Sequence, residues 1–300
     1  MSYKLTNKLV VAISSRALFD LEMENSIYEN EGLPAYTEHQ ITHEDELLKP
    51  GTAFSLVQAL LDLNHLGKEA QVEVIILSRN SPSTGLRVFN SIEKKDLNIK
   101  RAAFTGGEKI SHYLNALEVD LFLSKNKEDV QDAIDAGFAA ARLYDAPKDF
   151  HPNENQIRIA FDGDAVIFSE ESEAIYKERG LDAFAANEKE FASDPLSEGP
   201  FAKFLLTLSK IKKEEPKRIR IALVTSRNSP AHKRAILTLR KWGVDVDEAF
   251  FLGGVGKTDI LKAFNAHIFF DDQEIHLDSA SEEIPSGKVP YPSNSKLNNV

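Results

Sequence analysis

Short apolar runs alternate with longer polar or amphipathic segments along most of the chain. Eight of these runs are four to seven residues long and rich in Val, Ile, Leu and Phe. Runs of this kind are typical of buried strands, and their alternation with helices predicts an α/β fold with mainly parallel sheets flanked by helices. The predicted strands are 8–13, 72–77, 101–104, 120–123, 157–161, 218–224, 248–252 and 267–270, and amphipathic helices are predicted over 53–66 and 201–211.

Two segments lack this alternation. Residues Ala146–Gln156 are polar and contain proline, which is typical of a connection between structural units. The tail after about Ser279 is rich in Ser, Pro and Asn. We expect it to be irregular, with one short strand near Val289.

The chain repeats itself at a constant offset of 148 residues. The pentapeptide Ser78–Pro82 recurs as Ser226–Pro230, and other identical residues recur at the same offset. Many matches at one offset indicate an internal duplication. We therefore expect two α/β halves, residues 1–149 and 150–300. The further matched pairs are Ala12 with Ala160, Gly32-Leu33 with Gly180-Leu181, Gly51 with Gly199, and Lys109 with Lys257.

Chemically active residues follow the four predicted strands of the second half. In open α/β sheets, ligands bind beyond the carboxyl ends of the strands. The sequence therefore predicts a site at one edge of this sheet. The residues that follow the strands in order are Asp162 and Asp164, then Thr225, then Lys257, then Asp271 and Asp272.

Carboxylates, a hydroxyl and an ammonium group together suit phosphoryl transfer. Carboxylate oxygens are the ligands that Mg²⁺ prefers. A carboxylate can attack phosphorus, while a metal ion and a lysine offset the charge on the phosphoryl oxygens. A second carboxylate two residues further along an extended segment points to the same side and can transfer protons.

Composition narrows the range of partners. The net charge of −11 would repel the phosphates of a nucleic acid, so we expect no nucleic-acid partner. No apolar run approaches the ~20 residues of a membrane-spanning helix, and Leu9–Ile13 is too short for the core of a signal peptide. With 0 cysteines, a disulfide framework is excluded. These features predict a cytoplasmic protein, and they leave a homo-oligomer open.

The order Asp-x-Asp, Thr, Lys and Asp-Asp, each at its own strand end, resembles the haloacid dehalogenase superfamily of Rossmann-like phosphatases. By this resemblance Asp162 is the nucleophile and Asp164 the general acid/base, whose backbone carbonyl also binds Mg²⁺. Thr225 would hold a phosphoryl oxygen and Lys257 would neutralise the phosphoaspartate. Asp271 and Asp272 would anchor the metal, with Asp272 favoured as the direct ligand.

Three longer segments resemble the AMP-preferring cytosolic 5′-nucleotidases, and the similarity extends over nearly the whole chain. The resemblance implies Mg²⁺-dependent hydrolysis of nucleoside 5′-monophosphates to nucleoside and phosphate. A phosphatase of another small monoester, such as a sugar phosphate, is the alternative enzyme. A non-catalytic nucleotide-binding regulator is the alternative class. The segments are Ala12–Glu22, Ala160–Val166 and His267–Gln273.

The residues that would bind the part of the substrate beyond its phosphate are less clearly indicated by the sequence. Residues 169–199 match a small helical cap in size, and the rings of Tyr176 and Phe184 within it can stack on a nucleobase or simply pack the cap. Arg227 can bind a phosphate through two hydrogen bonds, and the adjacent Ser226 is a further candidate for substrate binding. Alternatively, Arg227 has the same structural role as Arg79, its counterpart in the repeat.

The first half lacks the catalytic residues. Ser14 and Arg16 stand at the positions of Asp162 and Asp164, and Ser124 and Lys125 stand at those of the Asp-Asp pair. We therefore expect an inactive scaffold. A sharper hypothesis is that Arg16, Lys109 and Lys125 form an anion site for a nucleotide effector.

Overall fold

The computed structural model describes residues 3–65 and 71–299. Ten strands form one sheet, and two more form a separate two-stranded antiparallel sheet. The strands are β1 (Leu9–Ile13), β2 (Phe19–Asp20), β3 (Lys49–Pro50), β4 (Val72–Ser78), β5 (Arg101–Phe104), β6 (Leu121–Ser124), β7 (Ala140–Leu143), β8 (Ile157–Phe161), β9 (Ile219–Thr225), β10 (Glu248–Phe251), β11 (Ile268–Asp271) and β12 (Ser286–Lys288).

Helices cover the large sheet and extend from its ends. They are α1 (Ser15–Leu18), α2 (Glu22–Thr42), α3 (Phe54–Asp62), α4 (Leu86–Lys94), α5 (Ser111–Leu114), α6 (Lys127–Asp135), α7 (Glu171–Glu190), α8 (Ala202–Glu214), α9 (His232–Trp242), α10 (Thr258–Phe264) and α11 (Glu274–Ala280). Short turns of other helical types are η1 (Leu63–His65), η2 (Gly163–Ile167) and η3 (Lys296–Asn299). Among the described residues, no helix combines the length and hydrophobicity needed to cross a bilayer.

All eight predicted strands are present within one or two residues of their expected bounds. The four residues of β6 and of β11 are fully buried, as strands covered on both faces by helices must be. The predicted helix 53–66 is α3 followed by η1, and Leu66 lies outside the described residues. The strand expected near Val289 is β12, which ends at Lys288.

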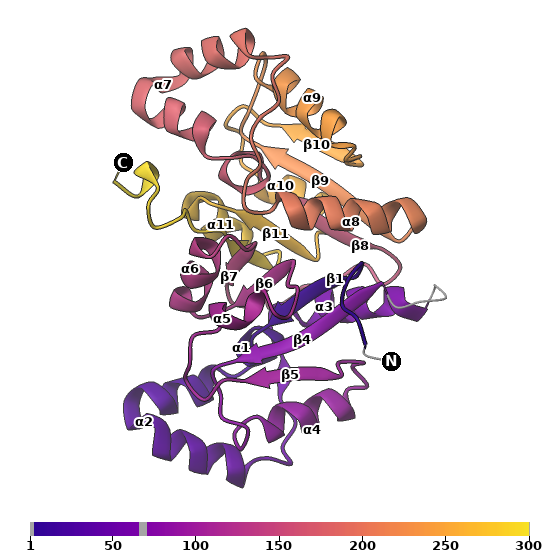
Figure 1. The fold of residues 1–300 in the computed structure, drawn as a ribbon, viewed down its shortest axis with the longest axis vertical. Helices are drawn as coiled ribbons and strands as arrows, with labels where there is room; N and C mark the ends of the chain where they lie inside the picture. The colour runs from indigo at the N-terminus through magenta and orange to yellow at the C-terminus, as the bar shows by residue number, and fades with distance from the viewer. Residues whose placement is uncertain (1–2, 66–70, 300) are drawn as a thin grey trace.

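The sheet shows the duplication directly. Its order is β10-β9-β8-β11-β12-β7-β6-β1-β4-β5 (Figure 1), so each half contributes five strands in the same relative order. Within each half the pairing is parallel, whereas β12 pairs antiparallel with β7 across the junction. Equivalent strands of the two halves thus meet, which places an approximate two-fold axis at the middle of the sheet.

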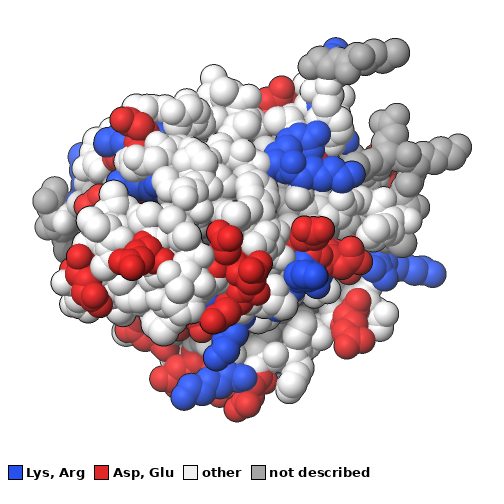
Figure 2. Space-filling view, turned by 90° about the horizontal axis from the view of Figure 1, so that it is seen from below, with Lys and Arg blue, Asp and Glu red and all other residues white. Residues whose placement is uncertain are grey.

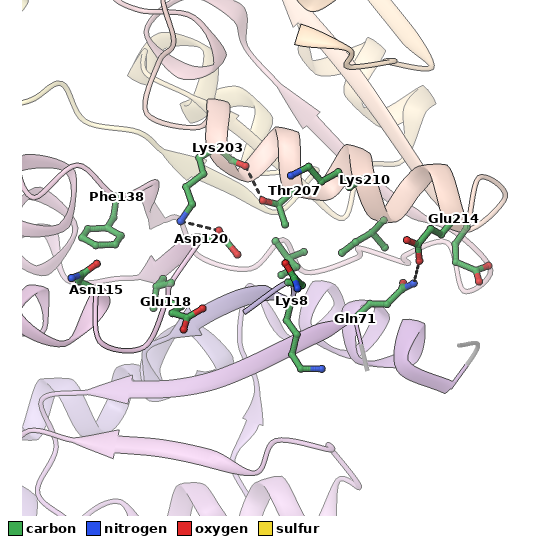
Figure 3. Close-up of a pocket in the computed structure, with 15 residues that line it drawn as sticks. Lys8, Gln71, Asn115, Glu118, Asp120, Phe138, Lys203, Thr207, Lys210 and Glu214 are labelled. Atoms are coloured by element: carbon green, nitrogen blue, oxygen red, sulfur yellow. Dashed lines mark hydrogen bonds and ion pairs between the residues drawn. The ribbon is translucent and has the colours of Figure 1, made fainter. Parts of the chain in front are cut away.

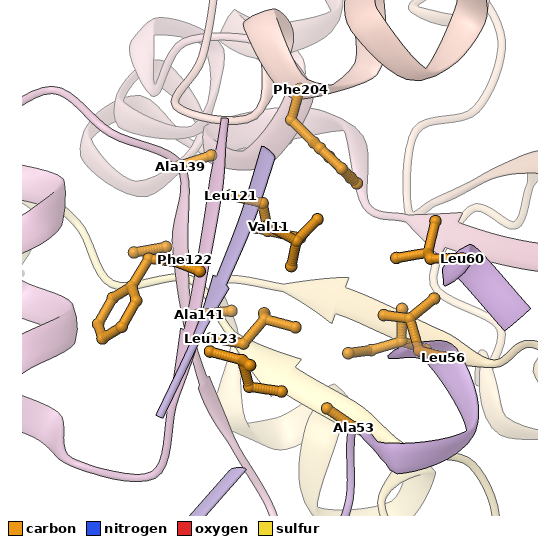
Figure 4. Close-up of a cluster of buried hydrophobic side chains, with 14 of the residues drawn as sticks. Val11, Ala53, Leu56, Leu60, Leu121, Phe122, Leu123, Ala139, Ala141 and Phe204 are labelled. Carbon is orange, nitrogen blue, oxygen red and sulfur yellow. The ribbon is translucent and has the colours of Figure 1, made fainter. Parts of the chain in front are cut away.

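The two halves share one hydrophobic core. Helix α8 of the second half contacts β1 of the first, and α3 of the first half contacts β8 of the second. Figure 4 shows Phe204 of α8 pointing toward Val11 and Leu60, and all three side chains are fully buried. Burial of this kind contributes roughly 1.5–3 kcal/mol per large side chain, so the halves stabilise each other.

A polar opening of about 840 Å³ borders this shared core. In Figure 3, Lys203 of α8 reaches Asp120 with an Nζ–Oδ1 distance of 3.1 Å, and the Gln71 amide donates to Glu214 at 2.5 Å. These contacts join α8 to the amino-terminal side of the first-half strands. On the face drawn in Figure 2, acidic and basic side chains are interspersed.

Long helices with the same kink stand at the corresponding place in both halves. Gly32 in α2 has φ 84° and ψ −179°, and Gly180 in α7 has φ 82° and ψ −179°. Glycine adopts such a positive φ without the steric penalty that a Cβ would bring, which explains why both kinks contain glycine. The segment predicted as a cap, 169–199, therefore contains α7, and its counterpart α2 is kept in the first half (Figure 1).

Candidate active site

Four elements bring the predicted catalytic residues together. Asp162 follows β8, Thr225 ends β9, Asp271 ends β11, and Lys257 directly precedes α10. Because β8, β9 and β11 are parallel neighbours, their carboxyl ends lie at one edge of the sheet. All four residues are at least 95% buried, which is rare for charged groups unless they are paired.

Lys257 links two of the carboxylates. Its Nζ lies 2.5 Å from Asp162 Oδ1 and 2.6 Å from Asp271 Oδ2. Oxygens of Asp162, Asp271 and Asp272 all lie within 4.8 Å of one another. Three buried carboxyl groups thus face one ammonium group, so their full ionisation would leave two negative charges uncompensated.

The second aspartate of the Asp-Asp pair is partly unsatisfied. Tyr291 donates its hydroxyl to Asp272 Oδ2, whereas Asp272 Oδ1 is buried and has no hydrogen-bond partner among the described residues. Asp271, by contrast, accepts from Lys257 and from the Gln273 backbone, and it also contacts His276. An orphaned carboxylate oxygen and an excess of negative charge fit a divalent cation with oxygen ligands.

The ionisation of the cluster reflects the same imbalance. Burial raises the pKa of Asp162 to about 7, opposed by Lys257. Burial, together with Asp271 and Asp162, raises the pKa of Asp272 well above its usual value. The pKa of Asp271 is lowered, because Lys257 and His276 outweigh its burial. A cation beside Asp162 and Asp272 would favour their charged forms.

Asp164 belongs to a second, separate charge network. Arg227 donates Nε to Asp164 Oδ2 at 2.7 Å and Nη2 to Oδ1 at 2.6 Å, a bidentate pair. The same guanidinium donates Nη1 to Glu188 of α7, and Arg234 donates to the other Glu188 oxygen at 2.9 Å. Two carboxylates and two guanidinium groups balance, so this network needs no further ion.

Thr225 and Ser226 are adjacent in the sequence but differ in their exposure to solvent. Thr225 is buried, and its Oγ1 accepts from the Arg227 backbone at 3.2 Å. The same Oγ1 would lie 3.4 Å from a Cβ added to Gly163, so it faces the turn between Asp162 and Asp164. Ser226 is exposed.

The two predicted ring-binding residues form an edge-to-face pair on α7. The rings of Tyr176 and Phe184 are 6.3 Å apart at 79°, with Tyr176 47% exposed and Phe184 buried. Arg227 Cζ lies 5.4 Å from the centre of the Phe184 ring. The pair therefore borders the network that holds Asp164.

Sequence reasoning missed two residues of this site. Glu188 corresponds to Gln40 at the repeat offset of 148 residues. The acid in place of a neutral amide could have marked Glu188 as a candidate site residue. Tyr291 lies in the polar tail and carried no such signal. The tail contacts both halves at Tyr291. The Gln131 amide of α6 donates to the Tyr291 carbonyl, and the Tyr291 hydroxyl donates to Asp272.

The cations at the matching edge of the first half are already paired. Arg16 donates to Glu22 at 2.5 and 3.0 Å, and Lys125 contacts Glu22 at 2.7 Å and Asp145 at 2.5 Å. The hydrogen bond from Arg16, opposed by partial burial and aided by Lys125, lowers the pKa of Glu22 to about 2. Lys109 pairs with Asp132 at 3.0 Å.

Comparisons with known proteins give the chain a family. A family model described as 5′-nucleotidase matches residues 1–296. The human protein "Cytosolic 5'-nucleotidase 1B" is 38% identical over 291 residues, which cover 92% of this chain and 48% of that protein. The chain thus spans about half the length of this relative. A comparison with solved structures matches histidinol dehydrogenase from Elizabethkingia anophelis over 97% of this chain and 82% of that one, with 10% sequence identity. The TM-score of 0.24 is too low to indicate a shared fold.

Proposed function

Because the chain belongs to the 5′-nucleotidase family, we propose that its second half hydrolyses nucleoside 5′-monophosphates, with AMP as the representative substrate, in the cytoplasm. The observation that carries this proposal is the buried cluster of Asp162, Asp271 and Asp272 around Lys257. Residues 150–300 are the catalytic unit, with a cap at about 169–199, and residues 1–149 are an inactive repeat.

Magnesium is the cofactor that this cluster supports. Asp162, Asp272 and the backbone carbonyl of Asp164 would hold it. The unpartnered Oδ1 favours Asp272 as a direct ligand, because Lys257, Gln273 and His276 already engage the oxygens of Asp271. When bound, Mg²⁺ supplies Lewis-acid stabilisation of the phosphoryl oxygens.

The first chemical step transfers the phosphoryl group to Asp162. A carboxylate oxygen of Asp162 attacks phosphorus, and the bond from phosphorus to the ribose 5′-oxygen breaks. Asp164, which must take up a proton before this step, gives it to that leaving oxygen, so the nucleoside departs neutral. Lys257 lies against Asp162 Oδ1 and offsets charge on the phosphoryl group, beside the buried hydroxyl of Thr225.

The second step returns the enzyme to its starting state. Water attacks phosphorus, the bond to Asp162 breaks, and Asp164 takes the proton from the water. Arg227 acts on Asp164 as a positioning residue, because its guanidinium is bound to that carboxylate rather than directed at a phosphate. Glu188 fixes the other side of the same guanidinium and so ties α7 to the general acid/base.

Phosphate release from AMP, with and without Mg²⁺, tests the proposal. We expect release to require the metal and to fall at least 1000-fold in Asp162→Asn, which keeps the shape of the side chain but removes the nucleophile. Asp145→Asn is the matched control, because it makes the same change at an 88% exposed side chain in the first half. Trapping of phosphate on Asp162, detected by mass spectrometry, would identify the intermediate.

A panel of phosphomonoesters separates the alternatives. Faster release from sugar phosphates than from every nucleoside monophosphate would overturn the nucleotidase assignment and keep the phosphatase. Binding of AMP without any Mg²⁺-dependent release would overturn catalysis altogether and support a nucleotide-binding regulator.

A further inference from the structure

The first half contains a cavity of about 640 Å³ at the edge that corresponds to the active site. Its floor comes from residues that follow β1, β4 and β6, and α2 covers it. This volume lies within the roughly 300–1,000 Å³ of small-molecule sites. The inactive repeat has therefore kept a space where the catalytic half places its substrate.

An aromatic pair stands at the mouth of this cavity. Tyr28 and Tyr36 of α2 both line it, with ring centres 5.9 Å apart at 80°. Tyr176 and Phe184 of α7, at the same offset, have almost the same geometry, at 6.3 Å and 79°. Such rings can stack on a planar heterocycle whichever half carries them.

The groups that would handle phosphate have been removed from this cavity. Serines 14 and 124 replace the nucleophile and a metal carboxylate, and both line the cavity. Arg16, the cation at the position of the general acid, is held by Glu22. Arg79 is held by Asp129 at 2.5 Å instead of by a catalytic acid.

The charges that line the cavity cancel. Arg16, Arg79 and Lys127 are balanced by Glu24, Glu128 and Asp129. An anion that bound Arg16 or Arg79 would have to displace a carboxylate from an existing ion pair, whereas an uncharged ligand would not.

One polar atom in the cavity wall lacks a partner. The Ser15 hydroxyl oxygen is buried and makes no hydrogen bond to any described residue. Buried polar groups in native proteins are nearly always satisfied, so Ser15, a residue of the cavity wall, is a candidate hydrogen-bonding partner for a polar ligand. Asn80, which also lines the cavity, accepts from the Tyr36 hydroxyl at 3.1 Å through its Oδ1.

We propose that this cavity in the first half binds an uncharged nucleoside. This inference rests on the proposed function, since the aromatic pair it uses is the counterpart of the one beside the proposed catalytic site. The ligand is the substrate without its phosphate, which is the class of molecule that the reaction releases. The two halves would then hold the substrate and a molecule of the product class at equivalent places.

Calorimetric titration of the full chain with adenosine tests the proposal. We expect two sites per chain, one in each half. Tyr28→Ala and Leu33→Asp, both at side chains more than half exposed, should remove the first-half site or weaken it about 10- to 100-fold. Their matched controls are Tyr176→Ala and Leu181→Asp, which change the same positions of the repeat and should affect only the other site.

AMP and inorganic phosphate serve as competing probes in the same titrations. Tighter binding of AMP than of adenosine at the Tyr28-dependent site would overturn the assignment of an uncharged ligand. A single adenosine site that Tyr176→Ala weakens and Tyr28→Ala leaves intact would overturn the proposal entirely.

Hydrolysis of AMP by the same samples separates the two proposals. Hydrolysis with a single, Tyr176-dependent site means that the cavity is an empty remnant and only this inference fails. A Tyr28-dependent adenosine site in a chain that releases no phosphate supports the binding site, while the proposed function fails. Tyr28→Ala should leave the rate of phosphate release unchanged without added adenosine.

Discussion

Replacement of Glu188 by glutamine perturbs the charge network around Asp164 without touching the carboxylate cluster of Asp162, Asp271 and Asp272. Both Glu188 oxygens are engaged, one by Arg227 and the other by Arg234 and Ser172 at 2.9 Å each. The side chain is 0% exposed and that of Arg227 is 1% exposed. Glutamine keeps the shape but removes the charge, so one of two buried guanidinium groups loses its partner.

The expected cost follows from this burial. Removing one member of a buried ion pair typically costs about 3–5 kcal/mol, because the remaining charge stays buried without compensation. Glutamine can still accept one hydrogen bond, worth about 1.5–3 kcal/mol when the donor is charged. We therefore expect Glu188→Gln to destabilise the fold by about 2 kcal/mol, and Glu188→Ala by about 4 kcal/mol.

Denaturant unfolding and steady-state kinetics measure the two consequences. Glu190→Gln is the control, because Glu190 lies on the same helix and is exposed; its effect should stay within about 0.5 kcal/mol. If Arg227 positions Asp164, Glu188→Gln should also lower kcat for AMP about tenfold, or about 1.4 kcal/mol. The KM should change less than twofold, because Asp164 acts on the transition state.

Two results would refute this reasoning. Unfolding of Glu188→Gln at the same denaturant concentration as Glu190→Gln would mean that the buried network does not form. Loss of stability with an unchanged kcat would mean that Arg227 and Glu188 only hold α7 against the second half.

Three further predictions concern the metal, the tail and pH. Mg²⁺ should raise the melting temperature of the free chain in proportion to ln[Mg²⁺] at saturation, and Asp272→Asn should abolish the shift. Tyr291→Phe should weaken Mg²⁺ activation of phosphate release about 10-fold, since it removes the hydroxyl that orients Asp272. Burial, aided by Arg158, lowers the pKa of His267 from 6.5 to about 4. Protonation thus favours the unfolded chain, and up to about 3 kcal/mol of stability, present above pH 6.5, is lost as pH falls toward 4. His267→Gln should flatten that part of the unfolding profile, and an unaltered profile would contradict the assignment.

The strands that form the sheet were predictable because their own residues require burial. Two strands of the large sheet lie outside those apolar runs. β7 is the weakly apolar segment Ala140–Leu143 and was not predicted. β12, Ser286–Lys288, has no large apolar residue, although a short strand was expected near Val289. The sequence did not indicate that β12 pairs with both β11 and β7 and so joins the two halves, which is a tertiary effect.

The sequence indicated which residues of the candidate site lie together, because the carboxyl ends of parallel strands converge whatever the surrounding side chains are. Their partners were not, since Glu188 and Tyr291 reach the site from a cap helix and from the tail. Arg227 shows the limit most clearly. Its type and place predict a cation near the substrate, but only the structure shows that carboxylates already surround it.

The first half shows which partners the arginine at this position has when the candidate catalytic residues are absent. Arg79, the repeat of Arg227, still binds a carboxylate, but that of Asp129 in α6. Arg16 and Gln40 stand where Asp164 and Glu188 stand in the second half, so both acidic partners of Arg227 are absent together from the half without a nucleophile. An arginine needed only for packing would not tie the acid in the cap to the acid in the site. The joint presence of Asp164 and Glu188 in one half, and their joint absence from the other, is what the proposed role of Arg227 in positioning Asp164 requires.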